Sequence, residues 1–220
     1  MKLTALKYGR TEITESMAFV GGDEKVKLPI SLLFFLIETE GRKILVDVGC
    51  DTMPGFELFE FKKPVDVLED CGISRREITD IIITHAHHDH IDALRHYPQA
   101  KVYLHKDGLK YAEGFLAENT HLTLLDGDAL IAKNVKFKHI GGHLDGSGIV
   151  LIENGGKTYV LCGDECYTKE NLLHKKPTGS SFHPNESRRF VEEYSKESYI
   201  PILFHDPDLV SNLGGKVLFD

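Results

Sequence analysis

The stretch from residue 81 to residue 90 reads Ile81-Ile82-Ile83-Thr84-His85-Ala86-His87-His88-Asp89-His90. Its first three residues are apolar and β-branched, which is typical of a short strand buried on both faces. Directly after this strand, four potential metal ligands stand within six residues: His85, His87, Asp89 and His90. Metal ions of borderline softness bind neutral imidazole nitrogen and carboxylate oxygen. The stretch therefore predicts a metal site at the end of a buried strand.

The spacing of these ligands indicates two ions rather than one. A single ion cannot be bound by all four groups in so short a segment. Groups two residues apart can share an ion when the loop is extended, while the next pair turns toward a second ion. Two neighbouring ions are what two-metal hydrolysis requires. The alternative is a histidine-rich surface turn that binds metal incidentally, and the buried strand before the motif argues against it.

Length, composition and charge restrict the class of protein. The 220 residues contain no repeat, low-complexity tract or long linker, so we expect a single domain over residues 1–220. The formal net charge is −8, and no stripe of Lys and Arg could follow phosphates, so nucleic acid is not an expected partner. The N-terminus lacks the apolar stretch of a signal peptide, and the longest apolar run, Leu32–Ile37, is too short to cross a bilayer. We therefore expect a cytoplasmic protein that does not bind membranes.

The remaining cysteines and histidines show no spacing that recruits them to a site. Without a CxxC pair, the cysteines are expected to be buried free thiols: Cys50, Cys71, Cys162 and Cys166. Further histidines are expected to be solvated or hydrogen-bonded side chains: His88, His96, His105, His121, His139, His174 and His183.

Hydrophobic periodicity and turn residues predict many strands and few helices. Besides Ile81–Ile83, we expect strands at Lys2–Tyr8, Ile13–Val20, Pro29–Thr39, Lys43–Val48, Lys101–Leu104, Val135–Ile140, Gly148–Ile152, Lys157–Cys162 and Pro201–Phe204. The turn Glu40-Gly41 is expected to join the third and fourth of these as a hairpin. Helices are expected at Pro64–Cys71, Asp107–Glu113 and Asn185–Ser198, the last capped by Asn185, and Ser74 to Glu77 matches a capping box. Strand-rich halves, each closed by helices, indicate an α/β (α+β) fold of two packed sheets with helices outside.

The run Thr84–His90 resembles the signature of the metallo-β-lactamase superfamily, and the resemblance extends from roughly Pro29 to Asp206. Leu45-Val46-Asp47-Val48-Gly49 resembles the first motif of that family, in which the Asp supports a metal-binding loop. Later motifs are similar at Gly141-Gly142-His143, at Leu161-Cys162-Gly163-Asp164 and at His205. The resemblance implies a metallo-β-lactamase-like four-layer αββα sandwich.

The same resemblance implies a set of ligands for two metal ions. One ion would take His85, His87 and His143, the other would take Asp89, His90 and His205, and Asp164 would bridge both. We expect both ions to be Zn²⁺, with Fe or Mn as alternatives.

Two positions depart from the family pattern. Ile91-Asp92-Ala93 stands where many relatives have a pair of glycines, and Ser147 stands where many have a second histidine. Neither position is a metal ligand, and both are expected to line the mouth of the site. Inference from relatives about the substrate is therefore weaker than inference about the metal.

The segment that follows Asp164 is similar to one in N-acyl homoserine lactonases, where a Tyr three residues after the bridging Asp points at the substrate carbonyl. The resemblance implies that Tyr167 donates a hydrogen bond to the developing oxyanion. The alternative is a tyrosine packed on the rim with its hydroxyl in water. The aromatic residues of Phe56–Phe61 could shelter an acyl chain or form an ordinary lid. Glyoxalase II proteins fit less well, because they add a helical glutathione-binding domain after the core.

These observations predict a hydrolase that acts on a lactone, ester or related acyl small molecule by attack of a metal-bound hydroxide. Metal coordination lowers the pKa of water from about 15.7 to roughly 7. Tyr167 would polarise the carbonyl, and Asp89 would return a proton to the leaving oxygen. Two alternatives remain. One is an iron-dependent oxidoreductase on the same fold, since the same ligands suit iron, and the other is a non-catalytic module that binds a metal or a ligand.

Overall fold

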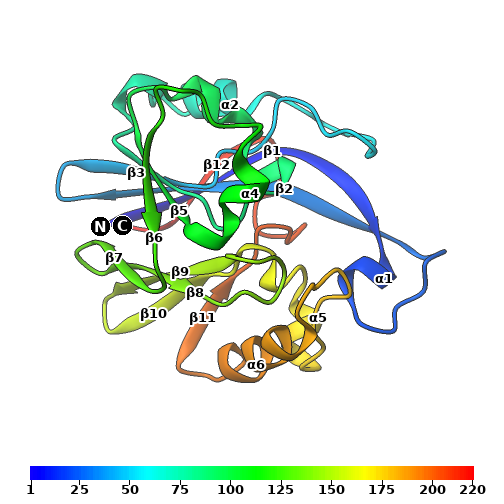
Figure 1. Cartoon of the computed structure of the whole chain (residues 1–220). Coiled ribbons are helices and arrows are strands. Elements are labelled where there is room, and N and C mark those ends of the chain that lie inside the picture. The colour runs from blue at the N-terminus through cyan, green and yellow to red at the C-terminus, as the bar shows by residue number, and fades with distance from the viewer.

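In the computed structural model, which describes residues 1–220, the strands form two sheets that pack against each other (Figure 1). The larger sheet contains, in spatial order, β12 (Gly214–Phe219), β1 (Lys2–Thr14), β2 (Lys27–Thr39), β3 (Arg42–Val46), β4 (Asp80–Ile82), β5 (Lys101–His105) and β6 (His121–Leu125). The smaller sheet contains β11 (Tyr199–Ile202), β10 (Lys157–Leu161), β9 (Gly148–Asn154), β8 (Val135–His139) and β7 (Ala129–Ala132). The two termini lie close together, because β12 pairs with β1.

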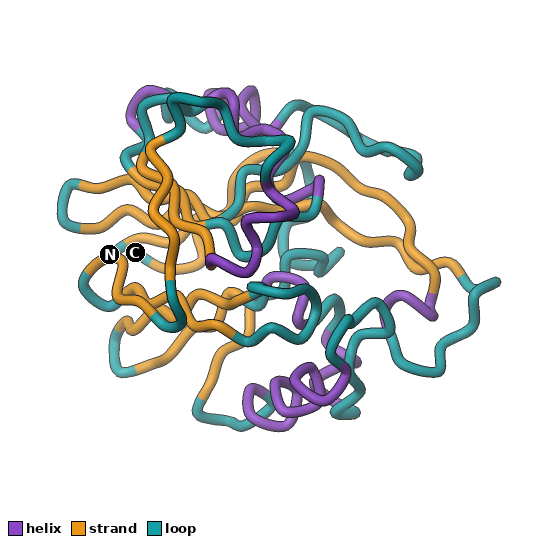
Figure 2. Tube along the Cα trace, viewed as in Figure 1, coloured by secondary structure: helices purple, strands orange, loops and turns teal.

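Helices cover the outer faces of both sheets (Figure 2). The α-helices are α1 (Glu15–Ala18), α2 (Pro64–Asp70), α3 (His88–Ile91), α4 (Leu109–Ala112), α5 (Lys169–Leu173) and α6 (Pro184–Tyr194). Short 3-10 helices are η1 (Arg75–Glu77), η2 (Asp92–His96), η3 (Lys106–Gly108) and η4 (Gly163–Glu165). No helix has the length and apolar character needed to span a membrane.

Side chains of the central strands point alternately to the two faces of a sheet, and this explains how the sheets and helices form layers. In β2, Phe34 faces the outer core against the helices, whereas its neighbour Phe35 faces the inner core between the sheets. The ring of Phe35 meets that of Phe204 from the smaller sheet at 4.7 Å between centroids. A third core joins the smaller sheet to Phe190 and Val191 of α6. Successive side chains of a strand point to opposite faces, so one apolar strand contributes to two cores. The predicted four-layer αββα sandwich is confirmed.

Local sequence signals account for several elements. The β2–β3 hairpin forms where it was predicted, and its turn residues Glu40 and Gly41 both have positive φ, at 47° and 76°. Two-residue hairpin turns of that shape match the twist of the flanking strands. Helix α2 covers Pro64–Asp70, and Ser74 and Glu77 form the predicted capping box at η1.

Several predicted boundaries are wrong. The segment Ile13–Val20 is not a separate strand: β1 continues to Thr14, whose side chain then accepts a hydrogen bond from the backbone N–H of Met17 and starts α1. Asn185 does not cap α6, because Pro184 already occupies the first turn and needs no N–H partner there. That helix ends at Tyr194, before the predicted Ser198.

Three strands and one surface cysteine differ from the sequence analysis. Strands β6, β7 and β12 were not predicted. They lie at sheet edges, and most of their side chains are exposed or half-buried, so their sequences lack the continuous apolar runs of central strands. The four cysteines are free, and three are buried, but Cys71 is exposed. It lies at the C-terminal end of α2, outside the core.

Candidate metal centre

The ends of strands from both sheets bring the predicted ligands to one place. His85 follows β4, His143 follows β8, Asp164 lies in η4 after β10, and His205 follows β11. Asp89 and His90 lie in α3, one turn beyond His87. Because β10 and β11 run parallel, their carboxyl ends meet at the same edge of the smaller sheet. All predicted ligands therefore fall into two adjoining groups able to hold a metal ion: His85, His87, His143 and Asp164, and Asp89, His90 and His205.

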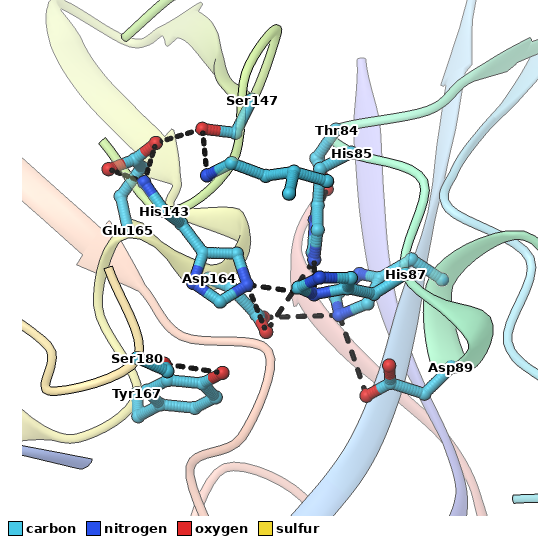
Figure 3. Close-up of polar contacts among 12 residues, drawn as sticks. Thr84, His85, His87, Asp89, His143, Ser147, Asp164, Glu165, Tyr167 and Ser180 are labelled. Carbon is cyan, nitrogen blue, oxygen red and sulfur yellow. Dashed lines mark hydrogen bonds and ion pairs between the residues drawn. The ribbon is translucent and has the colours of Figure 1, made fainter. Parts of the chain in front are cut away.

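The first group consists of three imidazoles and one carboxylate oxygen (Figure 3). His87 Nδ1 lies 3.1 Å from His85 Nε2 and 2.9 Å from His143 Nε2. Asp164 Oδ2 lies 3.6 Å from His85 Nε2 and 3.5 Å from His143 Nε2. Ligands about 2.1 Å from a tetrahedral ion are separated by about 3.4 Å. The spacing of these four atoms is therefore that of a tetrahedral site.

The second group uses the other oxygen of Asp164. Asp164 Oδ1 lies 3.1 Å from His90 Nε2 and 3.0 Å from His205 Nε2. Asp89 Oδ2 lies 3.6 Å from His90 Nε2 and 3.8 Å from His205 Nε2. The two oxygens of Asp164 thus face different groups, which is the arrangement that a bridging carboxylate needs.

Hydrogen bonds behind the imidazoles determine which nitrogen faces the centre. His205 Nδ1 lies 2.9 Å from the carbonyl oxygen of Ser31, and His90 Nδ1 lies 2.6 Å from Asp47 Oδ2. Both partners are acceptors, so Nδ1 of each ring carries a proton and Nε2 is the nitrogen that faces the centre. Such partners fix the tautomer and the orientation of a metal-binding imidazole.

Burial makes the first group suitable for a cation. Burial lowers the pKa of His85 well below its usual value, and it lowers the pKa of His143 to about 4. Both rings are therefore neutral near pH 7. Several nitrogen and oxygen lone pairs point to one place, and there are too few protons for all of them to form hydrogen bonds with one another. A bound metal ion would accept these lone pairs. In the second group, the buried His90 Nε2 likewise has no hydrogen-bond partner. The residues fit two ions, and nitrogen and oxygen ligands of this kind suit zinc, iron and manganese.

Asp47 lies behind the metal-binding loop and contacts two of its segments. Its Oδ1 accepts the backbone N–H of Thr84 at 2.7 Å, and its Oδ2 accepts the Thr84 hydroxyl at 2.7 Å as well as His90 Nδ1. The residue adopts φ +58°, an uncommon backbone conformation for a residue other than glycine. One carboxylate thus fixes the start of the loop and one of the imidazoles.

We expect Asp47→Asn to weaken metal binding by about 10–100-fold without abolishing folding. An amide has only one acceptor oxygen and would turn its own N–H groups toward at least one of the donors that Asp47 now accepts. Competition with a chromophoric chelator measures the affinity. Asp80→Asn is the matched control, because Asp80 is a buried carboxylate paired with Arg42 at the opposite end of β4. Equal affinities in both variants would assign Asp47 a purely structural role.

A cavity of about 290 Å³ opens beside the two groups. Its lining includes five of the predicted ligands, Tyr167 and six apolar residues: Ile13, Met17, Ile30, Met53, Pro54 and Phe56. No Lys or Arg lines it. Of the predicted aromatic segment, only Phe56 reaches the cavity, whereas Phe61 packs on Tyr8 and Phe59 forms a bridge with Arg10.

Tyr167 lies in the cavity wall rather than on a solvated rim. It is 5% exposed, and its ring stacks on His205 with 5.2 Å between centroids. Burial and the nearby carboxylate of Asp164 raise its pKa well above the usual value, so the hydroxyl is protonated. The hydroxyl of Ser180 donates a hydrogen bond to the Tyr167 oxygen at 3.3 Å. Tyr167 is the acceptor in this bond, so its own proton can be donated to another acceptor, and the carboxylate of Asp164 is one such neighbour.

Several residues of the cavity were not predicted from the sequence. His88, expected only to be a solvated or hydrogen-bonded side chain, lines it, and so do Met17 and Ser180. The backbone N–H groups of Gly179 and Ser180 both donate to the carbonyl oxygen of Met17, which joins two distant segments. No local pattern could have revealed this contact, because the residues are far apart in the chain.

The two departures from the family pattern do not line the mouth, contrary to expectation. Ile91 and Ala93 are buried in the outer core, and Asp92 Oδ2 accepts the backbone N–H of Asp51 at 2.8 Å. Ser147 is also buried. The segment that replaces the glycine pair therefore packs inside the protein and ties η2 to the loop after β3.

A third cluster, His105, Asp107 and His139, has the residue types of a metal site, but both ring nitrogens of His105 are already hydrogen-bonded. The rings of His105 and His139 stack with 3.9 Å between centroids. Both ring nitrogens of His105 face backbone N–H groups, those of Asp107 and Gly127, at 3.3 and 3.1 Å. Whichever nitrogen carries the lone pair, a backbone donor already occupies it. His105 is thus a hydrogen-bonded side chain, as expected.

Comparison with known proteins gives a family match over most of the chain. The model of the metallo-beta-lactamase superfamily matches residues 33–194. Among curated proteins, hydroxyacylglutathione hydrolase from Actinobacillus pleuropneumoniae serotype 5b (strain L20) is 31% identical over 108 residues. That match covers 47% of this chain and 42% of the relative, so this chain matches less than half the length of that protein.

Solved structures share the fold. A quorum-quenching N-acyl homoserine lactone hydrolase superposes with a TM-score of 0.83 at 22% identity and covers 96% of this chain and 94% of its own. AidC, a dizinc quorum-quenching lactonase in complex with a product, superposes with a TM-score of 0.73 at 14% identity, over 99% of this chain and 94% of its own. At these identities the similarity establishes the arrangement of the layers.

Proposed function

The chain belongs to the metallo-beta-lactamase superfamily, and from that premise we propose that it is a dinuclear metal-dependent hydrolase of uncharged lactones, esters or related acyl compounds. The observation that carries the proposal is the position of Asp164, whose two oxygens face two separate groups of buried ligands. In this proposal His85, His87 and His143 hold one ion, and Asp89, His90 and His205 hold the other. We propose Zn²⁺ for both, in line with the neighbour described as dizinc.

When bound, two such ions would supply an activated water at neutral pH and a Lewis acid for the carbonyl oxygen. Residues of the chain provide the remaining interactions. Tyr167 lies in the wall of the cavity and accepts, rather than donates, in its bond with Ser180, so its hydroxyl can donate to the oxygen of a substrate carbonyl as negative charge develops. Asp89 lies at the boundary between the ligands and the cavity, where its carboxylate can pass a proton to the leaving oxygen.

The lining of the cavity supports an uncharged substrate. Six apolar side chains face the ligands and could cover an acyl chain, while no Lys or Arg is present to pair with a carboxylate. A buried anion without a partner is strongly disfavoured. Hydroxyacyl derivatives of glutathione and β-lactam antibiotics both carry carboxylates, whereas acyl lactones and simple esters do not. The charge of the pocket therefore favours the chemistry of the lactone hydrolases over that of hydroxyacylglutathione hydrolase.

We expect gently purified protein to hold about two ions per chain and to hydrolyse acyl homoserine lactones or aryl esters. On the same preparation, a β-lactam and a hydroxyacyl-glutathione thioester should be turned over far more slowly, because each would bury a carboxylate. Elemental analysis gives the metals, and kcat/KM for each substrate gives the preference. Protein that contains no metal, or that prefers an anionic substrate, would contradict the proposal. Bound iron with a redox change instead of hydrolysis would favour an oxidoreductase.

A further inference from the structure

Glu165 follows the proposed bridging residue in sequence but points away from the metal centre (Figure 3). It is completely buried. Its carboxylate accepts the backbone N–H of Gly142 at 3.1 Å and that of His143 at 3.2 Å, and it also accepts the hydroxyl of Ser147. A buried carboxyl group that accepts from three donors of one loop holds that loop in place, because each buried donor would otherwise be left without a partner.

The loop from Gly141 to Ser147 is closed around this carboxylate. The Ser147 hydroxyl accepts the backbone N–H of Leu144 at 3.2 Å while it donates to Glu165. The Ser147 carbonyl accepts the backbone N–H of Gly141 at 2.9 Å. At Gly142 a side chain would collide with the Glu165 carboxylate, so only glycine permits this close approach.

Ser147, at the position where many relatives have a histidine, therefore links the loop to the carboxyl group of Glu165. We propose that Glu165, with Ser147, is a positioning residue that sets His143 against His87 and Asp164, and thereby controls one of the two metal positions. This inference rests on the proposed metal centre. The effect is selective, because the imidazoles of the other group are oriented by different partners: His90 by Asp47 and His205 by Ser31.

Asp145 lies in the same loop but on its outer side, and it serves as a control for the loss of a carboxylate. Asp145 Oδ2 accepts from Lys110 Nζ at 2.7 Å and from the Tyr111 hydroxyl at 3.0 Å, and Asp145 Oδ1 contacts His183 Nε2 at 2.5 Å. These contacts lie near the surface, where ion pairs contribute little to stability. Asp145→Asn therefore removes a carboxylate from the same loop without touching the backbone of His143.

The test compares Glu165→Gln and Ser147→Ala with Asp145→Asn as the control. Glutamine keeps the size of the side chain but has only one acceptor oxygen for three donors. Zn²⁺ titration should show that one of the two affinities falls by about 10–100-fold in Glu165→Gln. In Ser147→Ala the same affinity should fall less, and in Asp145→Asn both should stay unchanged. Circular dichroism of each variant checks the fold.

A second readout does not depend on metal. In metal-free protein, Glu165→Gln should speed hydrogen exchange at the amides of Gly142 and His143, but not at the amide of Thr84, which Asp47 holds. Unchanged exchange at these amides, or an equal loss of both Zn²⁺ affinities, would overturn the positioning role. Wild-type protein that binds no Zn²⁺ would overturn the proposed function, and the amide exchange would still decide the role of Glu165.

Discussion

Asp164→Ala is expected to lose both metal ions, and with them nearly all hydrolytic activity. The two carboxylate oxygens of Asp164 face the two groups, with Oδ2 toward His85 and His143 and Oδ1 toward His90 and His205. Its removal leaves each ion one ligand short and also removes the negative charge between two cations. The loss in kcat/KM should exceed the roughly 10²–10³-fold that loss of one oxyanion donor costs. Elemental analysis after gel filtration and lactone or ester assays measure the two effects.

Asp164→Asn separates the bridge from the charge. An asparagine keeps one acceptor oxygen, so this variant should retain about one ion where Asp164→Ala retains none. Asp80→Asn should keep both ions and serves as the control for loss of a buried carboxylate away from the centre. Two ions and full activity in Asp164→Ala would show that the bridging assignment is wrong, whatever the other ligands do.

The positions of the proposed ligands were predicted partly from local sequence. His85 follows a run of β-branched residues that is typical of a buried strand, and the strand β4 does end just before it. The family resemblance then selects His143, Asp164 and His205 from the other histidines and acids. The structure places these residues within reach of one another. The β2–β3 hairpin was predicted on similar local grounds.

The contacts that support the site could not be predicted, because they join segments far apart in the chain. Ser147 and Glu165 are 18 residues apart, and Ser180 and Tyr167 are 13 apart. Neither pair has a spacing that belongs to a helix or a strand, so no periodicity marks it. Their proximity depends on how loops cross the end of the smaller sheet. From the sequence alone, Ser147 could be described only as a serine at a position where many relatives have a histidine. The fold shows that its hydroxyl donates a hydrogen bond to Glu165.

Edge elements were missed for a related reason. Strand β12 pairs with β1 through its backbone, from Phe219 beside Leu3 to Gly214 beside Lys7. Its side chains are largely exposed or half-buried, so the pairing leaves no alternation of apolar residues in the sequence. A strand that is specified mainly by a backbone partner from the other end of the chain is visible only once that partner is in place.

We expect Tyr167→Phe to lower kcat on the best lactone or ester substrate by about 10²-fold, with KM and metal content little changed. Phenylalanine preserves the ring that stacks on His205 and removes only the hydroxyl. A hydrogen bond to a developing oxyanion is stronger in the transition state than in the ground state, so its loss appears in kcat. Because a metal ion polarises the same oxygen in parallel, the effect should lie at the lower end of the range for an oxyanion donor.

Ser180→Ala distinguishes donation by Tyr167 from simple packing. Ser180 donates to the Tyr167 oxygen and does not contact a proposed ligand through its side chain, so its loss should lower kcat only modestly in the wild-type background. In the Tyr167→Phe background the same substitution should have almost no further effect, since the bond it removes is already absent. Additive effects of the two substitutions would mean that Ser180 acts on the substrate by another route. If kcat is unchanged in Tyr167→Phe, the resemblance to lactone hydrolases extends only to the metal centre. The apolar residues of the cavity wall would then offer the acyl chain only general apolar contact.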